Sequence, residues 1–172
     1  MLNVKEATDN FKSYLDDGLL TKIAVKPEVV RVHIKNAKES LEVAALLLQN
    51  DHSLWTIVSA YYAMFYMANA VLNKLNYKVG SRISHKVAAD ALVVLVRDRL
   101  KRKLFDDYEA TRNEALQLIG SDEIIESFEL ERIKRSNIQY STTDQVKKAK
   151  AITSFERAKR FVFEMEGLIS CL

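Results

Sequence analysis

The sequence contains very few residues that break regular secondary structure. Among its 172 residues there is one proline, Pro27, and there are four glycines. A protein of many short strands needs far more turn residues, so a many-stranded β fold is disfavoured and long helices are favoured. No segment shows the apolar–polar alternation that is typical of a half-buried strand, and no repeat or low-complexity linker divides the chain.

Cysteine is nearly absent as well. Cys171 is the only one, so no internal disulfide can form, and we expect a cytoplasmic protein. The N-terminal residues lack the basic and apolar regions of a signal peptide. No apolar run approaches the roughly 18 residues of a membrane span, so we expect no membrane partner. The net charge of +3 permits nucleic-acid binding without arguing for it.

Apolar residues recur at spacings of three and four along most of the chain, a pattern that predicts amphipathic helices. In chain order, we expect helices at about residues 3–17, 27–48, 53–75, 84–103 and 105–119, another from 121 onward, and a last one from Thr143 or Asp144. The predicted fold class is all-α: an up-and-down bundle of four to five long helices, with an added N-terminal helix and one short inserted helix.

The helix ends carry recognisable capping residues. Gly18 suits the end of the first helix and Pro27 the start of the second. Asp51 or Ser53 is expected to cap the third helix and Ser84 the fourth. The third helix carries two adjacent apolar stripes, which places it at the centre of the bundle. The basic run over 97–103 fits either an exposed helix end or a phosphate-contact patch.

Four segments, taken in order, resemble the HEPN family. Residues 59–66 (SAYYAMFY) are similar to its signature helix, and residues 84–86 (SHK) resemble the Thr-His-Lys start of the next helix. Residues 135–140 (RSNIQY) resemble its Arg-x-x-x-Asp-Tyr or Arg-x(4–6)-His region, and residues 158–162 its closing helix. We therefore expect one HEPN-like domain over 1–172, with a core at about 28–172 and an N-terminal extension at 1–25.

The resemblance implies a helical homodimer that works on or near RNA or nucleotides. Many members of the family are ribonucleases, often toxins paired with a nucleotidyltransferase antitoxin. They are regarded as metal-independent, with a histidine that transfers protons and an arginine that holds the scissile phosphate. This division of roles makes physical sense, because guanidinium matches phosphate bidentately and imidazole titrates near neutral pH. We accordingly expect no cofactor and no metal.

The sequence departs from the family pattern after Arg135. No histidine follows within four to six residues; Tyr140 occupies the nearest position, and Gln139 replaces the usual aspartate. A tyrosine, with a pKa near ~10, is a poor base at neutral pH. Arg135 and Tyr140 are therefore candidate contacts to phosphate or RNA, together with Asn69 and Tyr66 on the third helix. Glu131 and Arg135 are four residues apart, which places them on one face of a helix. They form either an ion pair at the edge of the bundle or part of a cleft.

Three hypotheses follow for the function. The first is a HEPN-like module that associates with RNA or a nucleotide, as partner of a nucleotidyltransferase in a toxin–antitoxin-type pair, without efficient catalysis. The second is a metal-independent endoribonuclease that uses Arg135 with Tyr140 or the more distant His85. The third is a structural bundle whose site has decayed. The first two differ in whether RNA is cut, and the first and third in whether anything binds.

Overall fold

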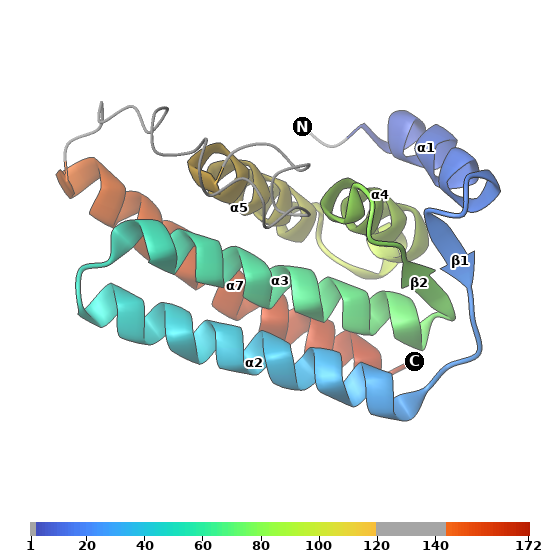
Figure 1. Cartoon of the computed structure of the whole chain (residues 1–172), viewed down its shortest axis with the longest axis horizontal. Coiled ribbons are helices and arrows are strands. Elements are labelled where there is room, and N and C mark those ends of the chain that lie inside the picture. The colour runs from blue at the N-terminus through green and yellow to red at the C-terminus, as the bar shows by residue number, and fades with distance from the viewer. Residues whose placement is uncertain (1–2, 120–143) are drawn as a thin grey trace.

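The computed structural model describes residues 3–119 and 144–172 of the chain (Figure 1). Its elements, in chain order, are α1 (Val4–Asp16), β1 (Leu20–Lys22), α2 (Pro27–Gln49), α3 (Ser53–Lys74), β2 (Tyr77–Val79), α4 (Ser84–Val96), the 3-10 turn η1 (Arg97–Arg99), α5 (Arg102–Ile119) and α7 (Asp144–Ser170). The predicted all-α class is confirmed. The helix expected from residue 121 onward lies outside the described residues.

Helix α3 is the centre of the bundle, as its two apolar stripes predicted. It packs against α2, α4, α5 and α7, and most of its residues are buried. Alanines at the contacts allow these neighbours to approach closely: Ala60, Ala63 and Ala68 of α3 and Ala37 of α2 are fully buried. Figure 1 shows α2 and α3 side by side in front, α7 behind them, and α1, α4 and α5 along the upper edge.

Two predicted N-caps are displaced by one residue. His52 precedes α3 and Ile83 precedes α4, so Ser53 and Ser84 are the first helical residues, and no side chain caps either helix. The physical reason is a left-handed residue just before each helix: φ is 60° at Asp51 and 44° at Ile83. The Asp51 carboxylate, expected to cap α3, accepts a hydrogen bond from Lys148 instead.

The basic run does not continue α4 as predicted. Helix α4 ends at Val96, the chain makes the short turn η1, and Leu100 is extended, with φ −136° and ψ 154°. Helix α5 then begins at Arg102, three residues before its predicted start. The cations of residues 97–103 are therefore divided between the end of one helix and the start of the next.

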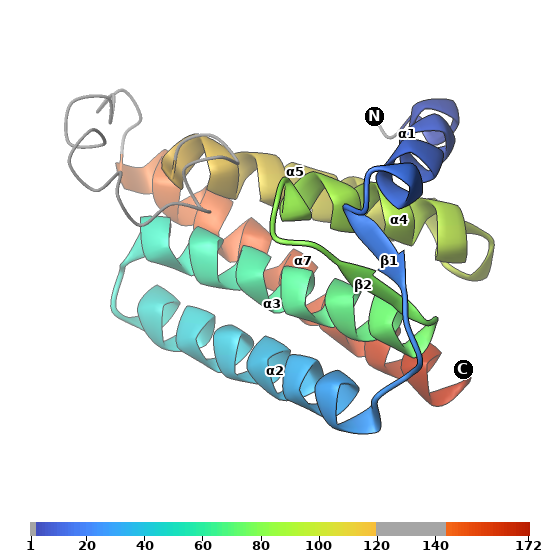
Figure 2. The ribbon, with the colours of Figure 1, turned by 45° about the vertical axis from the view of Figure 1, so that its right-hand side comes forward.

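A two-stranded antiparallel sheet was not predicted. Leu20 pairs with Val79, and Lys22 with Tyr77, so that β1 and β2 join the N-terminal segment to the bundle (Figure 2). Strands of three residues are too short for an alternating pattern to be visible in the sequence. Helix α1 is held further by Asp90 of α4, which accepts hydrogen bonds from Tyr14 at 2.8 Å and Asn10 at 2.9 Å.

A network of charges joins α5 to α7. Arg157 lies 3.4 Å from Asp107 and 3.2 Å from Glu114, and Arg160 lies 3.2 Å from the same Asp107. Ser154 donates a hydrogen bond of 2.7 Å to Glu114. The Asp107 side chain is only 13% exposed, so its charge depends on these arginines for compensation.

The Arg157→Ala variant tests the importance of this network. We expect a loss of about 1–3 kcal/mol in the free energy of unfolding, between the values for exposed and buried pairs, because two shielded carboxylates each lose one of their two partners. The Lys159→Ala variant is the matched control, since Lys159 forms an exposed pair with Glu156; it should cost less than about 0.5 kcal/mol. Urea unfolding measures both values, and equal small losses would contradict the prediction.

Candidate functional site

The candidate site residues taken from the sequence separate into two groups. Arg135 and Tyr140 lie outside the described residues, so the structure does not place them. His85, Asn69 and Tyr66 are described, and they lie at three different positions around α3. The exposure and hydrogen bonds of each show what its side chain is able to do.

His85 is a buried residue held inside the bundle. It is only 2% exposed, and its Nδ1 lies 2.6 Å from the hydroxyl of Tyr61. Its ring also packs against Phe65, with 4.4 Å between the ring centroids. The left-handed turn at Ile83 leads directly into the first turn of α4, where His85 lies. In this arrangement the imidazole supports the packing of α4 on α3 and is shielded from a ligand in solution.

Asn69 is likewise turned toward protein rather than toward a ligand. Its side-chain nitrogen donates a hydrogen bond of 2.9 Å to the carbonyl of Phe65, one turn earlier in the same helix. Asn73 makes the same bond to Asn69. Both asparagines are buried, and these bonds satisfy part of their hydrogen-bonding capacity inside the core.

Tyr66 lines an open groove between α2 and α3. The groove has a volume of about 520 Å³, and Tyr62, Asn36 and Glu39 also contribute to it. Burial, with a smaller effect of Tyr66, raises the pKa of Tyr62 above its ordinary value of 10. The Tyr62 hydroxyl therefore stays protonated at neutral pH and is available as a hydrogen-bond donor.

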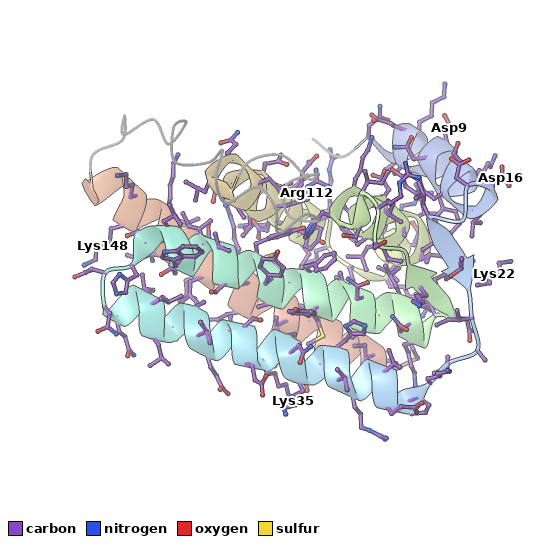
Figure 3. All side chains as sticks on the ribbon, viewed as in Figure 1. Asp9, Asp16, Lys22, Lys35, Arg112 and Lys148 are labelled. Carbon is purple, nitrogen blue, oxygen red and sulfur yellow. The ribbon has the colours of Figure 1, made fainter. Side chains whose placement is uncertain are left out.

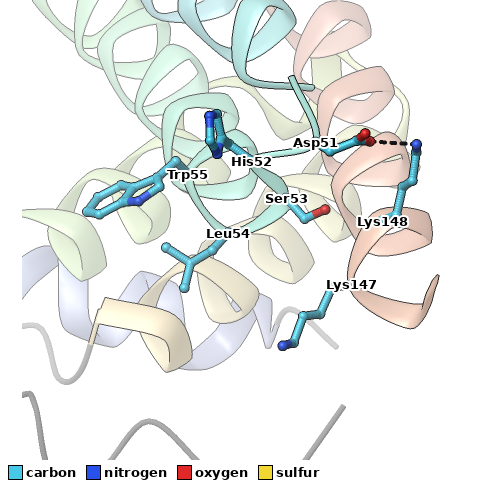
Figure 4. Close-up of a pocket in the computed structure, with 7 residues that line it drawn as sticks. All are labelled: Asp51, His52, Ser53, Leu54, Trp55, Lys147 and Lys148. Carbon is cyan, nitrogen blue, oxygen red and sulfur yellow. Dashed lines mark hydrogen bonds and ion pairs between the residues drawn. The ribbon is translucent and has the colours of Figure 1, made fainter. Parts of the chain in front are cut away.

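A second pocket, not found from the sequence, lies where the α2–α3 turn meets the start of α7 (Figure 4). Its volume is about 620 Å³. It is lined by Asp51, His52, Ser53, Leu54, Trp55, Lys147 and Lys148. We call this set of residues the Trp55 pocket. Because α7 begins about ninety residues after α3, only the fold brings its lysines to the same pocket as the tryptophan.

The Trp55 pocket combines an exposed aromatic ring with cations. Trp55 is 59% exposed, which is unusual for the largest apolar side chain. Lys148 lies 2.6 Å from Asp51 and lowers the pKa of that carboxyl, first through the hydrogen bond and then through its charge. Lys147 lines the same pocket, beside the positive end of the α3 dipole. The pocket thus holds two kinds of group that nucleic acids use, an aromatic face on which a base can stack and cations that can bind phosphate, on opposite sides of the turn (Figure 4).

The described residues contain no group of His, Cys, Asp or Glu that could hold a metal ion. None of the described helices is both long and apolar enough to cross a membrane.

The chain matches the HEPN domain family over residues 30–168. This range includes the signature segment on α3, His85 and both lysines of the Trp55 pocket, and it excludes α1 and β1. No curated protein matches the chain.

His33 of α2, which packs near Tyr66, makes stability sensitive to pH. Burial lowers its pKa from the ordinary value of 6.5, and its Nδ1 is buried without a hydrogen-bond partner. The unfolded chain therefore takes up the proton at higher pH than the folded one. It follows that stability is lost as the pH falls below 6.5 and through the lower folded pKa.

We expect the His33→Phe variant to lose less stability than the wild type between about pH 7.5 and about pH 5.5. Phenylalanine keeps an aromatic ring against Tyr66 but does not titrate. The control is Ile34→Val on the same helix, which should lower stability equally at both pH values. Urea unfolding of the three proteins at each pH measures the difference. An unchanged acid sensitivity in His33→Phe would show that another group titrates.

Proposed function

Because the chain belongs to the HEPN domain family, we propose that it is an RNA-binding module that does not cut RNA efficiently. Family membership supports an RNA-associated or nuclease-like module in general. The observation that favours binding over cleavage is the burial of His85. Cleavage by the family's usual route needs a histidine that reaches the substrate, whereas His85 is 2% exposed and bonded to Tyr61.

The other two histidines differ in whether an RNA could reach them. His33 is half-buried beside Tyr66, and His52 is exposed at the rim of the Trp55 pocket. His52 is therefore the described histidine that an RNA in this pocket would meet. Cleavage and binding are therefore compared directly in His52→Ala, which lacks this imidazole.

The Trp55 pocket offers the surface for RNA. Its indole provides a stacking face for a base, and such stacking contributes about 1–3 kcal/mol for each base. Lys147 and Lys148 add positive charge to the same pocket, although Asp51 neutralises part of it. A binding mode of this kind depends little on sequence and strongly on salt, because every base has an aromatic face and every nucleotide a phosphate.

A test uses labelled single-stranded RNA without added metal, and it scores gel shift and cleavage in the same samples. The wild type should shift RNA without cutting it. Trp55→Ala should weaken the shift roughly tenfold or more, because it removes the stacking face. Arg135→Ala should also weaken it, since we propose that Arg135 contacts phosphate. The control is Lys35→Gln, an exposed, paired lysine of α2 far from the pocket (Figure 3), which should bind like the wild type.

Each remaining outcome has a distinct meaning. Cleavage that disappears in Arg135→Ala or His52→Ala would overturn the proposal and make the protein a ribonuclease. If the wild type shows no gel shift and no cleavage, the proposal of RNA binding is wrong, and a nucleotidyltransferase partner becomes the favoured alternative. Co-purification with a nucleotidyltransferase encoded beside the gene would then be the measurement.

We further propose that the chain forms a homodimer through the outer face of α2 and α3. Val32, Val43 and Leu46 are large apolar residues exposed along one side of α2, beside the groove that Tyr62 and Tyr66 line. An apolar stripe of this kind is typical of an interface, and in an isologous contact each copy covers the other's stripe.

Leu46→Glu should convert the dimer to a monomer in analytical ultracentrifugation, because it replaces the most exposed residue of the apolar stripe by a charge. Gln49→Glu adds the same charge at the exposed end of the same helix and should remain dimeric. A monomeric wild type, or a Leu46→Glu protein that stays dimeric, would contradict this interface.

A further inference from the structure

One turn of α5 holds an unusual number of buried polar atoms that form no hydrogen bond. In residues 3–119 and 144–172 four such side-chain atoms occur, and three of them belong to Tyr108, Thr111 and Arg112. They are the tyrosine hydroxyl, the threonine hydroxyl and the guanidinium Nε; the tyrosine hydroxyl interacts weakly with Tyr61 but without the geometry of a hydrogen bond. Spacings of three and four place these residues on one side of the helix. Since buried polar groups are almost always paired, such a concentration points to a missing partner.

Arg112 is the most unusual of the three. It continues the stripe of Phe105, Tyr108 and Ala115, which are all buried. It is half-buried itself, and within the described part of the chain its side chain makes one hydrogen bond, from Nη2 to the side-chain oxygen of the neighbouring Asn113, at 3.3 Å. No carboxylate among the described residues pairs with it. Arg157 on α7, which packs against α5, is by contrast paired with two carboxylates. A shielded guanidinium without a counterion is costly.

The surroundings of Arg112 provide hydrogen-bond donors. Burial raises the pKa of Tyr108 to about 12, although the charge of Arg112 and the hydroxyl of Tyr61 offset part of the rise. The charge of Arg112 also lowers the pKa of Tyr14 on α1, against the larger effects that raise it. Arg112 therefore lies near the junction of α1, α4 and α5. Figure 3 shows it between α5 and α4. The nearby carboxylate of Asp90 already accepts bonds from Tyr14 and Asn10.

We propose that Arg112, Tyr108 and Thr111 form a binding site for a phosphate-type oxyanion. The three side chains supply a guanidinium and two hydroxyls, which at neutral pH can all donate hydrogen bonds to oxygen. A guanidinium matches a tetrahedral oxyanion with two parallel bonds, and Arg112, unlike Tyr108 and Thr111, keeps part of its surface exposed. The anion is either free phosphate or a phosphate of an RNA strand. This site is separate from the Trp55 pocket and does not depend on it.

The decisive measurement is NMR of the wild-type arginine Nε–H resonances during titration with inorganic phosphate at constant ionic strength. The Arg112 signal, assigned by its absence in Arg112→Gln, should shift and saturate. Phosphate should also raise the thermal midpoint of the wild type, and its apparent affinity should be roughly tenfold or more weaker for Arg112→Gln. Arg102→Gln is the matched control, because Arg102 is an exposed arginine at the start of the same helix.

A second titration uses a short single-stranded RNA without terminal phosphate. A shift with phosphate identifies a site for free phosphate, and a shift with RNA alone identifies a site for the strand's backbone; either result supports the oxyanion site. An Arg112 resonance that moves with neither ligand would overturn it and leave buried water as the partner of these atoms. Trp55→Ala should keep the phosphate-induced shift, so failure of RNA binding at the Trp55 pocket is distinguishable from failure here.

Discussion

The close packing of α3 against four other helices is the constraint on which the rest of the structure depends. A helix that is covered on nearly every side must be apolar around most of its circumference and small where neighbours cross it, and α3 meets both conditions. The signature segment at residues 59–66 therefore acts first as a packing element. Ala60, Tyr61, Ala63 and Met64 have no exposed surface. Ser59, Tyr62, Phe65 and Tyr66 are partly exposed, and the three aromatic residues among them are left for grooves and interfaces.

The same constraint explains why part of the fold was predictable and part was not. Long helices such as α2 and α7 repeat their apolar spacing over many turns, so their presence was clear from the sequence. The N-caps at Asp51 and Ser84 were displaced because left-handed residues at Asp51 and Ile83 set the turns, and backbone conformation of that kind leaves little trace in a non-glycine sequence. The β1–β2 ladder was missed because three-residue strands are stabilised by pairing across the chain rather than by local pattern.

Candidate site residues were harder to identify for a related reason. His85 and Asn69 are chemically versatile residues, but their roles depend on whether α3 and α4 leave them accessible, and both are buried. The Trp55 pocket joins residues separated by about ninety positions, so no local pattern predicts it. Trp55 itself belongs to the second stripe of α3, and a tryptophan in the first turn of a helix, beyond the reach of neighbouring helices, was the signal that could have found it.

The distribution of charges separates structural side chains from those available for function. Between α5 and α7, Arg157 and Arg160 are compensated by Asp107 and Glu114, so this network holds two helices together and has little affinity left for a ligand. Arg112 lies on the opposite side of α5, half-buried, and no carboxylate among the described residues pairs with it. Within the described residues, one half-buried arginine of this region is paired twice, whereas Arg112 lies near two hydroxyls that form no hydrogen bond; this contrast is what favours an external anion as the partner of Arg112.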